Sequence, residues 1–186
     1  MSDPVDTPRI AQFQIKDPNA MAIGGPMMGF LECIMADSVL PILQRYHLDK
    51  IEPNNWYPFA SYLQMMQEVT STDDLVSVGM AMMNNVPWPP EVYQLPFVDV
   101  LKSINDIYKL QHRGDVGEGY IMDFVDDHHV IITIANPYPD DLIYGCYWQI
   151  SKKFLPKGTE FEVYYDTAAP LRKEGGEVTK IHIVWG

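Results

Sequence analysis

The sequence predicts an α+β domain in which N-terminal helices pack on a four-stranded antiparallel sheet, in the order α-α-α-α-β-β-α-β-β. Two observations predict this class. Before residue 113, apolar residues recur every three or four positions, which is the spacing of one buried helix face. After Gly119, apolar and polar residues alternate in short β-rich runs, which is typical of strands with one wet face. We expect residues 25–186 to form a single domain and residues 1–24 to be a partly disordered lead.

Four helices are expected in the first part of the chain. They cover residues 27–46, 56–69, 75–85 and 97–112. Pro41 interrupts the first pattern and predicts a kink or a split into two helices, because proline has no N–H to donate. Pro58 falls in the first turn of the second helix, where a missing N–H costs nothing. Gly114 predicts the end of the fourth helix.

The second part of the chain predicts two hairpins separated by one helix. The strands cover residues 120–125, 130–134, 160–165 and 179–185, and the helix covers 140–154. This helix is apolar on several sides, so we expect it to be buried on more than one side. The sheet would cover one side, and either the other helices or a second copy of the chain would cover the rest. The second alternative predicts a homodimer.

The chain is acidic, with 25 Asp and Glu residues, 13 Lys and Arg residues and a formal net charge of −12. The basic residues are scattered, which disfavours nucleic-acid binding, because that needs clustered cations. The longest uncharged run, 75–90, is shorter than the ~20 apolar residues that span a bilayer. No secretory signal is visible at the start. We therefore expect a cytoplasmic protein without a membrane span, with Cys33 and Cys146 as buried free thiols.

No catalytic set of residues is visible. The sequence contains no Gly-x-Ser-x-Gly motif, phosphate-binding loop or dinucleotide fingerprint. The glycine-rich segment 114–119 precedes a strand rather than a helix, so we interpret it as a turn. No cysteine and histidine spacing predicts a metal site. The sequence thus favours a protein that is not an enzyme.

Methionines are concentrated in the first three predicted helical segments. Because methionine adapts to irregular apolar shapes, one interpretation is an apolar ligand pocket between helices and sheet. The alternative is an ordinary core or a dimer face. Trp88, in a proline-rich loop, is either an interface anchor or a pocket lid. Arg172 is either a cation for an acidic ligand group or a solvated loop residue. The candidate pocket residues are Met35, Met65, Met66, Met82, Met83, Trp88, Tyr144, Trp148 and Arg172.

Several short strings accompany the β-β-α-β-β order. They are Tyr46-His47-Leu48, Ile51-Glu52-Pro53, Trp56-Tyr57-Pro58, Asn136-Pro137-Tyr138-Pro139-Asp140, Pro170-Leu171-Arg172 and Gly175-Gly176. With these strings, the chain resembles the superfamily of haem nitric-oxide-binding domains, 4-vinyl reductase domains and TRAPP transport subunits. The resemblance covers about residues 25–185 and implies the fold of that superfamily.

The sequence departs from this superfamily where cofactors bind. The haem-binding branch uses a proximal histidine and a Tyr-x-Ser-x-Arg motif that holds the haem propionates, and this motif is absent here. The 4-vinyl reductase-like branch commonly carries cysteines around the final loop, where this chain has Leu171 and Thr179 or Lys180. The resemblance therefore implies a scaffold that kept its shape and lost its known cofactor chemistry.

Two histidines are candidate haem ligands. His112 and His47 end predicted helices, and either could bind haem iron if it faced a cavity. The alternative is a solvated imidazole that complements the helix dipole. His128 and His129 fall in the first hairpin turn, and adjacent side chains there point to opposite faces, which disfavours a joint metal site.

The leading prediction is a non-enzymatic small-molecule-binding or sensory-type domain that acts as a homodimer. Its ligand would be apolar, such as a tetrapyrrole or a lipid, with no cofactor required. The alternative is a protein interaction module of the TRAPP-like type. A weaker alternative is haem-based gas sensing through His112 or His47.

Overall fold

The computed structural model describes residues 11–186 apart from 34–35, 70–73 and 87. Its helices are α1 (Gly24–Leu31), α2 (Ala36–Arg45), α3 (Phe59–Val69), α4 (Leu75–Asn85), α5 (Phe97–Leu110) and α6 (Asp140–Phe154). Its strands are β1 (Met21–Ile23), β2 (Trp56–Pro58), β3 (His112–Arg113), β4 (Gly119–Asp126), β5 (His129–Ala135), β6 (Phe161–Tyr165) and β7 (Lys180–Trp185). The loops contain the short 3-10 helices η1 (Pro90–Gln94) and η2 (Arg172–Glu174). The predicted α+β class is confirmed.

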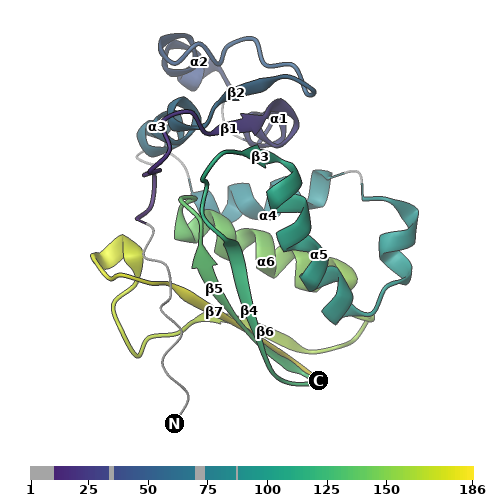
Figure 1. Ribbon diagram of the computed structural model, residues 1–186. Coiled ribbons are helices and arrows are strands. Elements are labelled where there is room, and N and C mark those ends of the chain that lie inside the picture. Colours follow the sequence, from purple (N-terminus) through teal and green to yellow (C-terminus); the bar gives the residue numbers. More distant parts are fainter. Residues whose placement is uncertain (1–10, 34–35, 70–73, 87) are drawn as a thin grey trace.

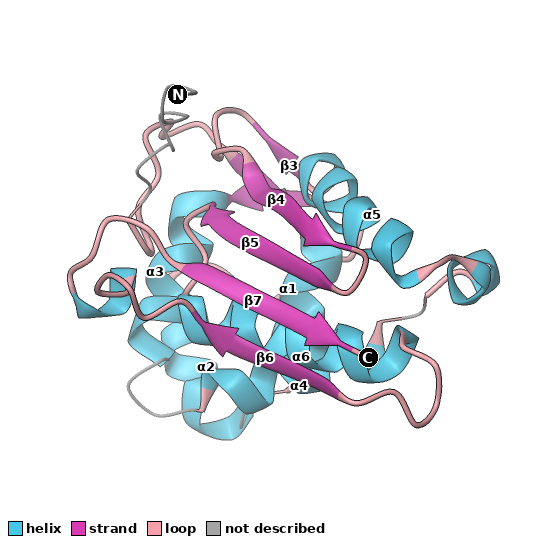
Figure 2. Ribbon diagram, turned by 90° about the horizontal axis from the view of Figure 1, so that it is seen from below, coloured by secondary structure: helices cyan, strands magenta, loops and turns pink. Residues whose placement is uncertain are grey.

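The larger sheet has four antiparallel strands in the order β4-β5-β7-β6. Ile132 lies opposite Met122 on one side and Ile181 on the other. Because side chains alternate between the two faces of a strand, this register gathers the apolar residues on one face. The helices α1, α4 and α6 lie behind the sheet in the view of Figure 2. The core of the domain therefore lies between this face and the helices.

The helix between the hairpins, α6, packs directly against α4. A Cβ atom added at Gly79 would overlap the carbonyl oxygen of Leu142, and one added at Gly145 would overlap that of Val76. These overlaps show that the two backbones touch where each helix carries a glycine. On another side, the Tyr144 hydroxyl donates a 2.7 Å hydrogen bond to the Val163 carbonyl of β6. The expectation that α6 is buried on more than one side is confirmed.

A second, three-stranded sheet in the order β2-β1-β3 was not expected from the sequence. Its strands have only two or three residues, too few to show a period of two. Residues 56–58, predicted as a first helical turn, instead pair with β1, and Met21 lies opposite Pro58. The edge position of β2 tolerates this proline. The small sheet gathers with α1, α2 and α3 at one end of the molecule, near the end of α5 (Figure 1).

The first predicted helix is split into α1 and α2, but Pro41 lies inside α2 rather than at the break. Val39 and Leu43, four positions apart, are both buried, so tertiary packing holds α2 together through the proline. No described helix is long and apolar enough to cross a membrane.

Candidate functional site

A cavity of about 570 Å³ lies between α1, α4, α5 and α6. Its walls are mainly aliphatic and include Met28, Met82, Met83, Ile104, Ile107, Leu142, Ile143 and Ile150. The volume falls within the range of roughly 300–1,000 Å³ that is typical of small-molecule sites. A site of this size and lining can hold a drug-sized apolar molecule.

The wall that α1 contributes contains Gly29, which faces open space. A Cβ atom added there would have no heavy atom within 4 Å, whereas one added at Gly24 would meet the backbone of Glu52. The start of α1 is therefore tightly packed, and the part of α1 beside the cavity is not.

Five tyrosines line the cavity, and they come from elements far apart in the sequence. They are Tyr62, Tyr108, Tyr120, Tyr138 and Tyr147. The Tyr108 hydroxyl donates a 2.6 Å hydrogen bond to the Val116 carbonyl. The Tyr147 hydroxyl is the one buried side-chain oxygen or nitrogen without a hydrogen-bond partner in the described part of the chain. Burial raises the pKa of the Tyr147 phenol well above its ordinary value, so the group is a neutral donor.

His112 also lines the cavity, and both of its ring nitrogens are engaged. Nδ1 lies 2.7 Å from the Tyr108 carbonyl oxygen, so Nδ1 carries the proton. Nε2 is then the acceptor for the Tyr138 hydroxyl at 3.0 Å. The ring packs 4.8 Å from the ring of Phe59, between centroids. Burial lowers the pKa of His112 to about 4, which keeps the imidazole neutral.

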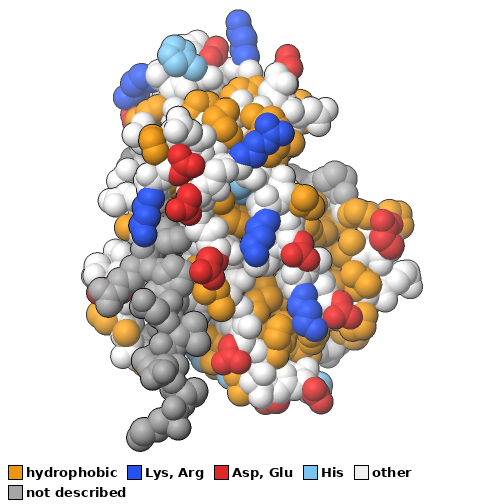
Figure 3. All heavy atoms as spheres, viewed as in Figure 1, with side chains coloured by type: hydrophobic (Ala, Val, Ile, Leu, Met, Phe, Trp, Pro, Cys, Tyr) orange, Lys and Arg blue, Asp and Glu red, His pale blue; other side chains and the backbone are white. Residues whose placement is uncertain are grey.

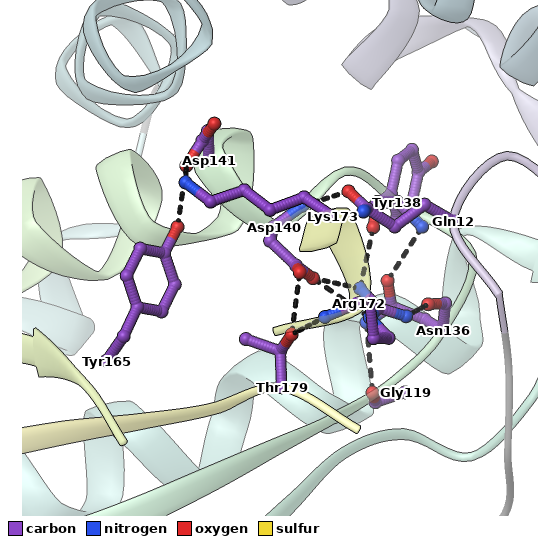
Figure 4. A network of polar contacts seen from close by, with 10 residues as sticks. All are labelled: Gln12, Gly119, Asn136, Tyr138, Asp140, Asp141, Tyr165, Arg172, Lys173 and Thr179. Carbon is purple, nitrogen blue, oxygen red and sulfur yellow. Dashed lines mark hydrogen bonds and ion pairs between the residues drawn. The ribbon is translucent and has the colours of Figure 1, made fainter. Parts of the chain in front are cut away.

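Arg172 lies in a buried ion pair rather than in the cavity. Its guanidinium donates from Nε to Asp140 at 2.9 Å, and it also contacts the Asn136 and Tyr138 carbonyl oxygens at 2.6 and 2.9 Å. The Thr179 hydroxyl donates to the other oxygen of Asp140 at 2.6 Å. Figure 4 shows these groups pointing at one another. The solvated-loop interpretation of Arg172 is wrong, because the side chain is only 2% exposed.

The predicted methionines divide between the cavity and the core. Met82 and Met83, on α4, line the cavity. Met65 and Met66, on α3, are fully buried and are not among its described lining residues. Met35 lies outside the described residues. The methionine cluster therefore does not form one continuous surface toward a ligand.

The three other aromatic candidates pack against neighbouring elements. Trp88 is buried, and its indole N–H donates a 3.2 Å hydrogen bond to the Met83 carbonyl. It is therefore neither a lid nor an exposed anchor. Tyr144 is bonded to β6. Trp148 lies 5.7 Å from Phe161, between ring centroids. These residues attach α4 and α6 to their surroundings and are not among the lining residues described.

The second haem-ligand candidate, His47, is exposed at the end of α2 and has a positive φ of 58°. His128 is exposed, and His129 contacts His182 of β7 at 2.9 Å across the sheet. No cluster of His, Cys, Asp and Glu in the described residues could hold a metal ion. Of the five histidines, the described cavity lining includes His112 alone.

Sequence reasoning missed the tyrosines and Gly29. Tyrosines at 62, 108, 120, 138 and 147 follow no shared period, and only the fold brings them to one cavity. Tyr138 lies within one of the short strings quoted above, which was the one available signal.

Comparison with protein-family models and with curated proteins finds no match for this sequence. Solved structures do match. An H-NOX protein from S. oneidensis in the Fe(II)NO ligation state has a TM-score of 0.65 and 12% identity, over 88% of this chain and 99% of its own. An unliganded Fe(II) H-NOX protein from K. algicida has a TM-score of 0.59 and 13% identity, over 88% and 96%. An oxygen-binding H-NOX domain related to soluble guanylate cyclases has a TM-score of 0.59 and 16% identity, over 87% and 92%.

At this level of identity the likeness is one of fold. The chain has the H-NOX fold, as the sequence resemblance predicts.

The charges around the cavity do not fit a haem. The two propionates of a haem are carboxylates, which bind Arg or Lys. Among the described lining residues, none is a lysine or an arginine, and the charged one is Glu32. Arg172 is already paired with Asp140. The nearby ammonium of Lys153 donates to the Asn84 carbonyl at 3.0 Å.

The residues that could bind the haem iron do not fit either. Iron would need Nε2 of His112, which accepts a hydrogen bond from Tyr138. Cys146 also lines the cavity, but burial raises the pKa of its thiol to about 12, which disfavours the thiolate that binds metals. The residues present thus disagree with a haem site.

Proposed function

We propose that this chain is a small-molecule-binding domain of the sensory type, whose ligand is largely apolar and occupies the cavity between α1, α4, α5 and α6. The observation that carries the proposal is a cavity of about 570 Å³ with aliphatic walls and few polar groups.

Two substitutions at Gly29 test the proposal. Gly29→Phe places a ring into the open space beside α1, and Gly29→Ala serves as the matched control because it adds only a methyl group. The measurement is the fluorescence of N-phenylnaphthylamine, a neutral apolar dye, titrated into each purified protein. We expect the wild type and Gly29→Ala to bind the dye, and Gly29→Phe to bind at least tenfold more weakly. Equal binding by all three, or none by the wild type, would contradict the proposal.

Haem-based gas sensing is a second candidate function. The observation that favours it is His112 in the cavity of a chain with the H-NOX fold. The test is an ultraviolet-visible titration of the purified protein with haem, compared with His112→Ala. Because the described cavity lining has no lysine or arginine, and because Nε2 of His112 is bonded to Tyr138, we expect no Soret band that depends on His112. A band that appears in the wild type and is lost in the variant would establish haem binding and replace the first proposal.

An interaction role, including the predicted homodimer, is a third candidate. Tyr93 and Leu95, at η1, are 50% and 42% exposed. Hydrophobic side chains gather on the right of Figure 3, where η1 lies. By contrast, α6, which motivated the dimer prediction, is covered by α4 and the sheet of its own chain. Light scattering over a concentration series measures self-association. A dimer that Tyr93→Ser and Leu95→Ser together dissociate would support the role, and a monomer at all concentrations would end it for homodimers.

A further inference from the structure

Tyr147 lies at the middle of α6, is 1% exposed, and lines the cavity. Its ring packs edge-on against Tyr120 at 5.5 Å between centroids, which fixes its position. Its hydroxyl has no hydrogen-bond partner among the described residues. A buried donor left without a partner is costly, and native proteins satisfy nearly all such groups. Among the described residues, this fully buried donor is thus left without a partner from the chain, on a residue that lines the cavity.

The phenols of Tyr108 and Tyr138 do not have this property. The Tyr108 hydroxyl donates to the Val116 carbonyl, and the Tyr138 hydroxyl donates to Nε2 of His112. Both groups are held by the chain itself. Tyr147 therefore differs from these two tyrosines, because its fully buried hydroxyl has no partner among the described residues. A water molecule could satisfy it as well as a ligand, and the experiment below separates these cases.

The charge of the lining restricts what the ligand carries. No cation is among the described lining residues, and the carboxylate of Glu32 is at the cavity. An anionic ligand would lose its hydration without gaining a partner of opposite charge. A neutral acceptor, such as a ketone, aldehyde or ester carbonyl, would lose much less and would accept a hydrogen bond from a phenol.

We propose that the cavity selects neutral, largely apolar ligands that carry a carbonyl-type acceptor, and that the Tyr147 hydroxyl donates the hydrogen bond that recognises this acceptor. The inference rests on the proposed function, because it names the ligand class of the same cavity. No covalent step is involved.

Three probes of nearly the same shape test it. Acetylnaphthalene carries a carbonyl, isopropenylnaphthalene replaces the oxygen with a methylene group, and naphthoate carries a negative charge. Dissociation constants are measured by displacement of N-phenylnaphthylamine from the wild type and from Tyr147→Phe. One hydrogen bond corresponds to about tenfold in affinity. We expect the wild type to prefer the ketone to the alkene by about tenfold, and to bind naphthoate at least tenfold more weakly than the ketone.

The preference for the ketone should disappear in Tyr147→Phe, which should bind the alkene as well as the wild type does. A preference that persists in this variant, or that the wild type lacks, would overturn the role of Tyr147 while leaving the pocket in place. Tighter binding of naphthoate than of the ketone would overturn the selection of neutral ligands. Dye binding that is unaffected by Gly29→Phe would instead overturn the proposed function on which the inference rests.

Thermal unfolding without ligand gives an independent measurement. Because the Tyr147 hydroxyl has no partner in the described chain, Tyr147→Phe should keep or raise the midpoint temperature. Tyr108→Phe is the control, since it removes a bonded hydroxyl and should lower the midpoint by several degrees. An equal loss in both variants would show that Tyr147 is bonded within the protein, and would overturn the inference.

Discussion

The network around Arg172 and the cavity wall at Tyr147 both hold polar side chains away from water. They differ in whether the chain itself supplies the hydrogen-bond partners of those side chains. In the network, Arg172 and Asp140 bond to each other, and Thr179 bonds to the remaining carboxylate oxygen. In the cavity, Tyr147 has no partner in the described chain. The first region is closed, because the chain itself supplies hydrogen-bond partners for Arg172, Asp140 and Thr179. The second is open, and a matching group must come from outside.

The difference separates structural from functional polar residues without reference to sequence motifs. From the sequence, Arg172 in its long loop looks like a ligand contact. In the structure, its bond to Asp140 fixes the loop before β7 to the start of α6. A tyrosine inside an apolar helix, such as Tyr147, looks like core, but its hydroxyl is the one fully buried side-chain group of the described residues that has no hydrogen bond. The number of hydrogen bonds that a buried group makes within the chain is the informative quantity.

The largest expected effect comes from breaking the closed network. Asp140→Asn keeps the shape of the side chain but leaves the Arg172 guanidinium buried without its counter-charge. We expect the free energy of unfolding to fall by about 3–5 kcal/mol, measured by urea denaturation. The matched control is Lys173→Met, which breaks the adjacent, partly exposed pair with Asp141 and should cost less than ~1 kcal/mol. Similar losses in the two variants would show that burial does not distinguish the pairs.

The next effect concerns His112, whose pKa is lowered from 6.5 to about 4 by burial. Between these values the unfolded chain binds a proton that the folded chain does not, so acid favours unfolding. We expect the free energy of unfolding to fall by about 3 kcal/mol from this group alone as the pH is lowered from 7 to 4.

The measurement for His112 is urea denaturation at several pH values, comparing the wild type with His112→Gln. His112→Gln should lack the fall of about 3 kcal/mol in the free energy of unfolding that His112 contributes between pH 7 and 4. His47→Asn is the control, because His47 is exposed and asparagine tolerates its positive φ. An identical decline in the wild type and His112→Gln would refute the assignment.

The smallest effect compares two glycines, one in the closed packing and one beside the open cavity. Gly145→Ala forces a methyl group against the Val76 carbonyl of α4 and should cost about 1–3 kcal/mol of unfolding free energy. Gly29→Ala meets no atom within 4 Å and should be neutral or stabilising by up to ~1 kcal/mol, since alanine favours helix. Thermal or urea unfolding measures both. A loss at Gly29 equal to that at Gly145 would mean that the wall beside the cavity is tightly packed.

Much of the fold could be predicted because its elements are long enough to repeat their pattern. The helices α3 to α6 show the period of 3.6, β6 and β7 show the period of 2, and β4 and β5 are runs of seven or eight residues rich in β-branched and aromatic side chains. The small sheet could not be predicted, since a two-residue strand such as β3 has no period. Its pairing with β1 places Ala22 opposite His112, 90 positions later in the chain, and no local signal records that.

The site was less predictable than the fold. Met82 and Met83 were identified from composition and do line the cavity, but Met65 and Met66 share the same helical pattern and face the core. Arg172 depends on Asp140, which is 32 positions earlier in the sequence. Space that no side chain fills, such as that beside Gly29, is a property of the assembled fold and has no signature in the sequence.

The composition of the cavity wall also has a spectroscopic consequence. None of the four tryptophans is among the described residues that line the cavity, whereas five of the eleven tyrosines are. Trp185 packs against Phe97, which is not one of those lining residues, so its emission reports on the integrity of the fold. A ligand in the cavity would change the near-ultraviolet absorption and circular dichroism of tyrosine instead. Occupancy and unfolding can therefore be followed as two separate signals in one unlabelled sample.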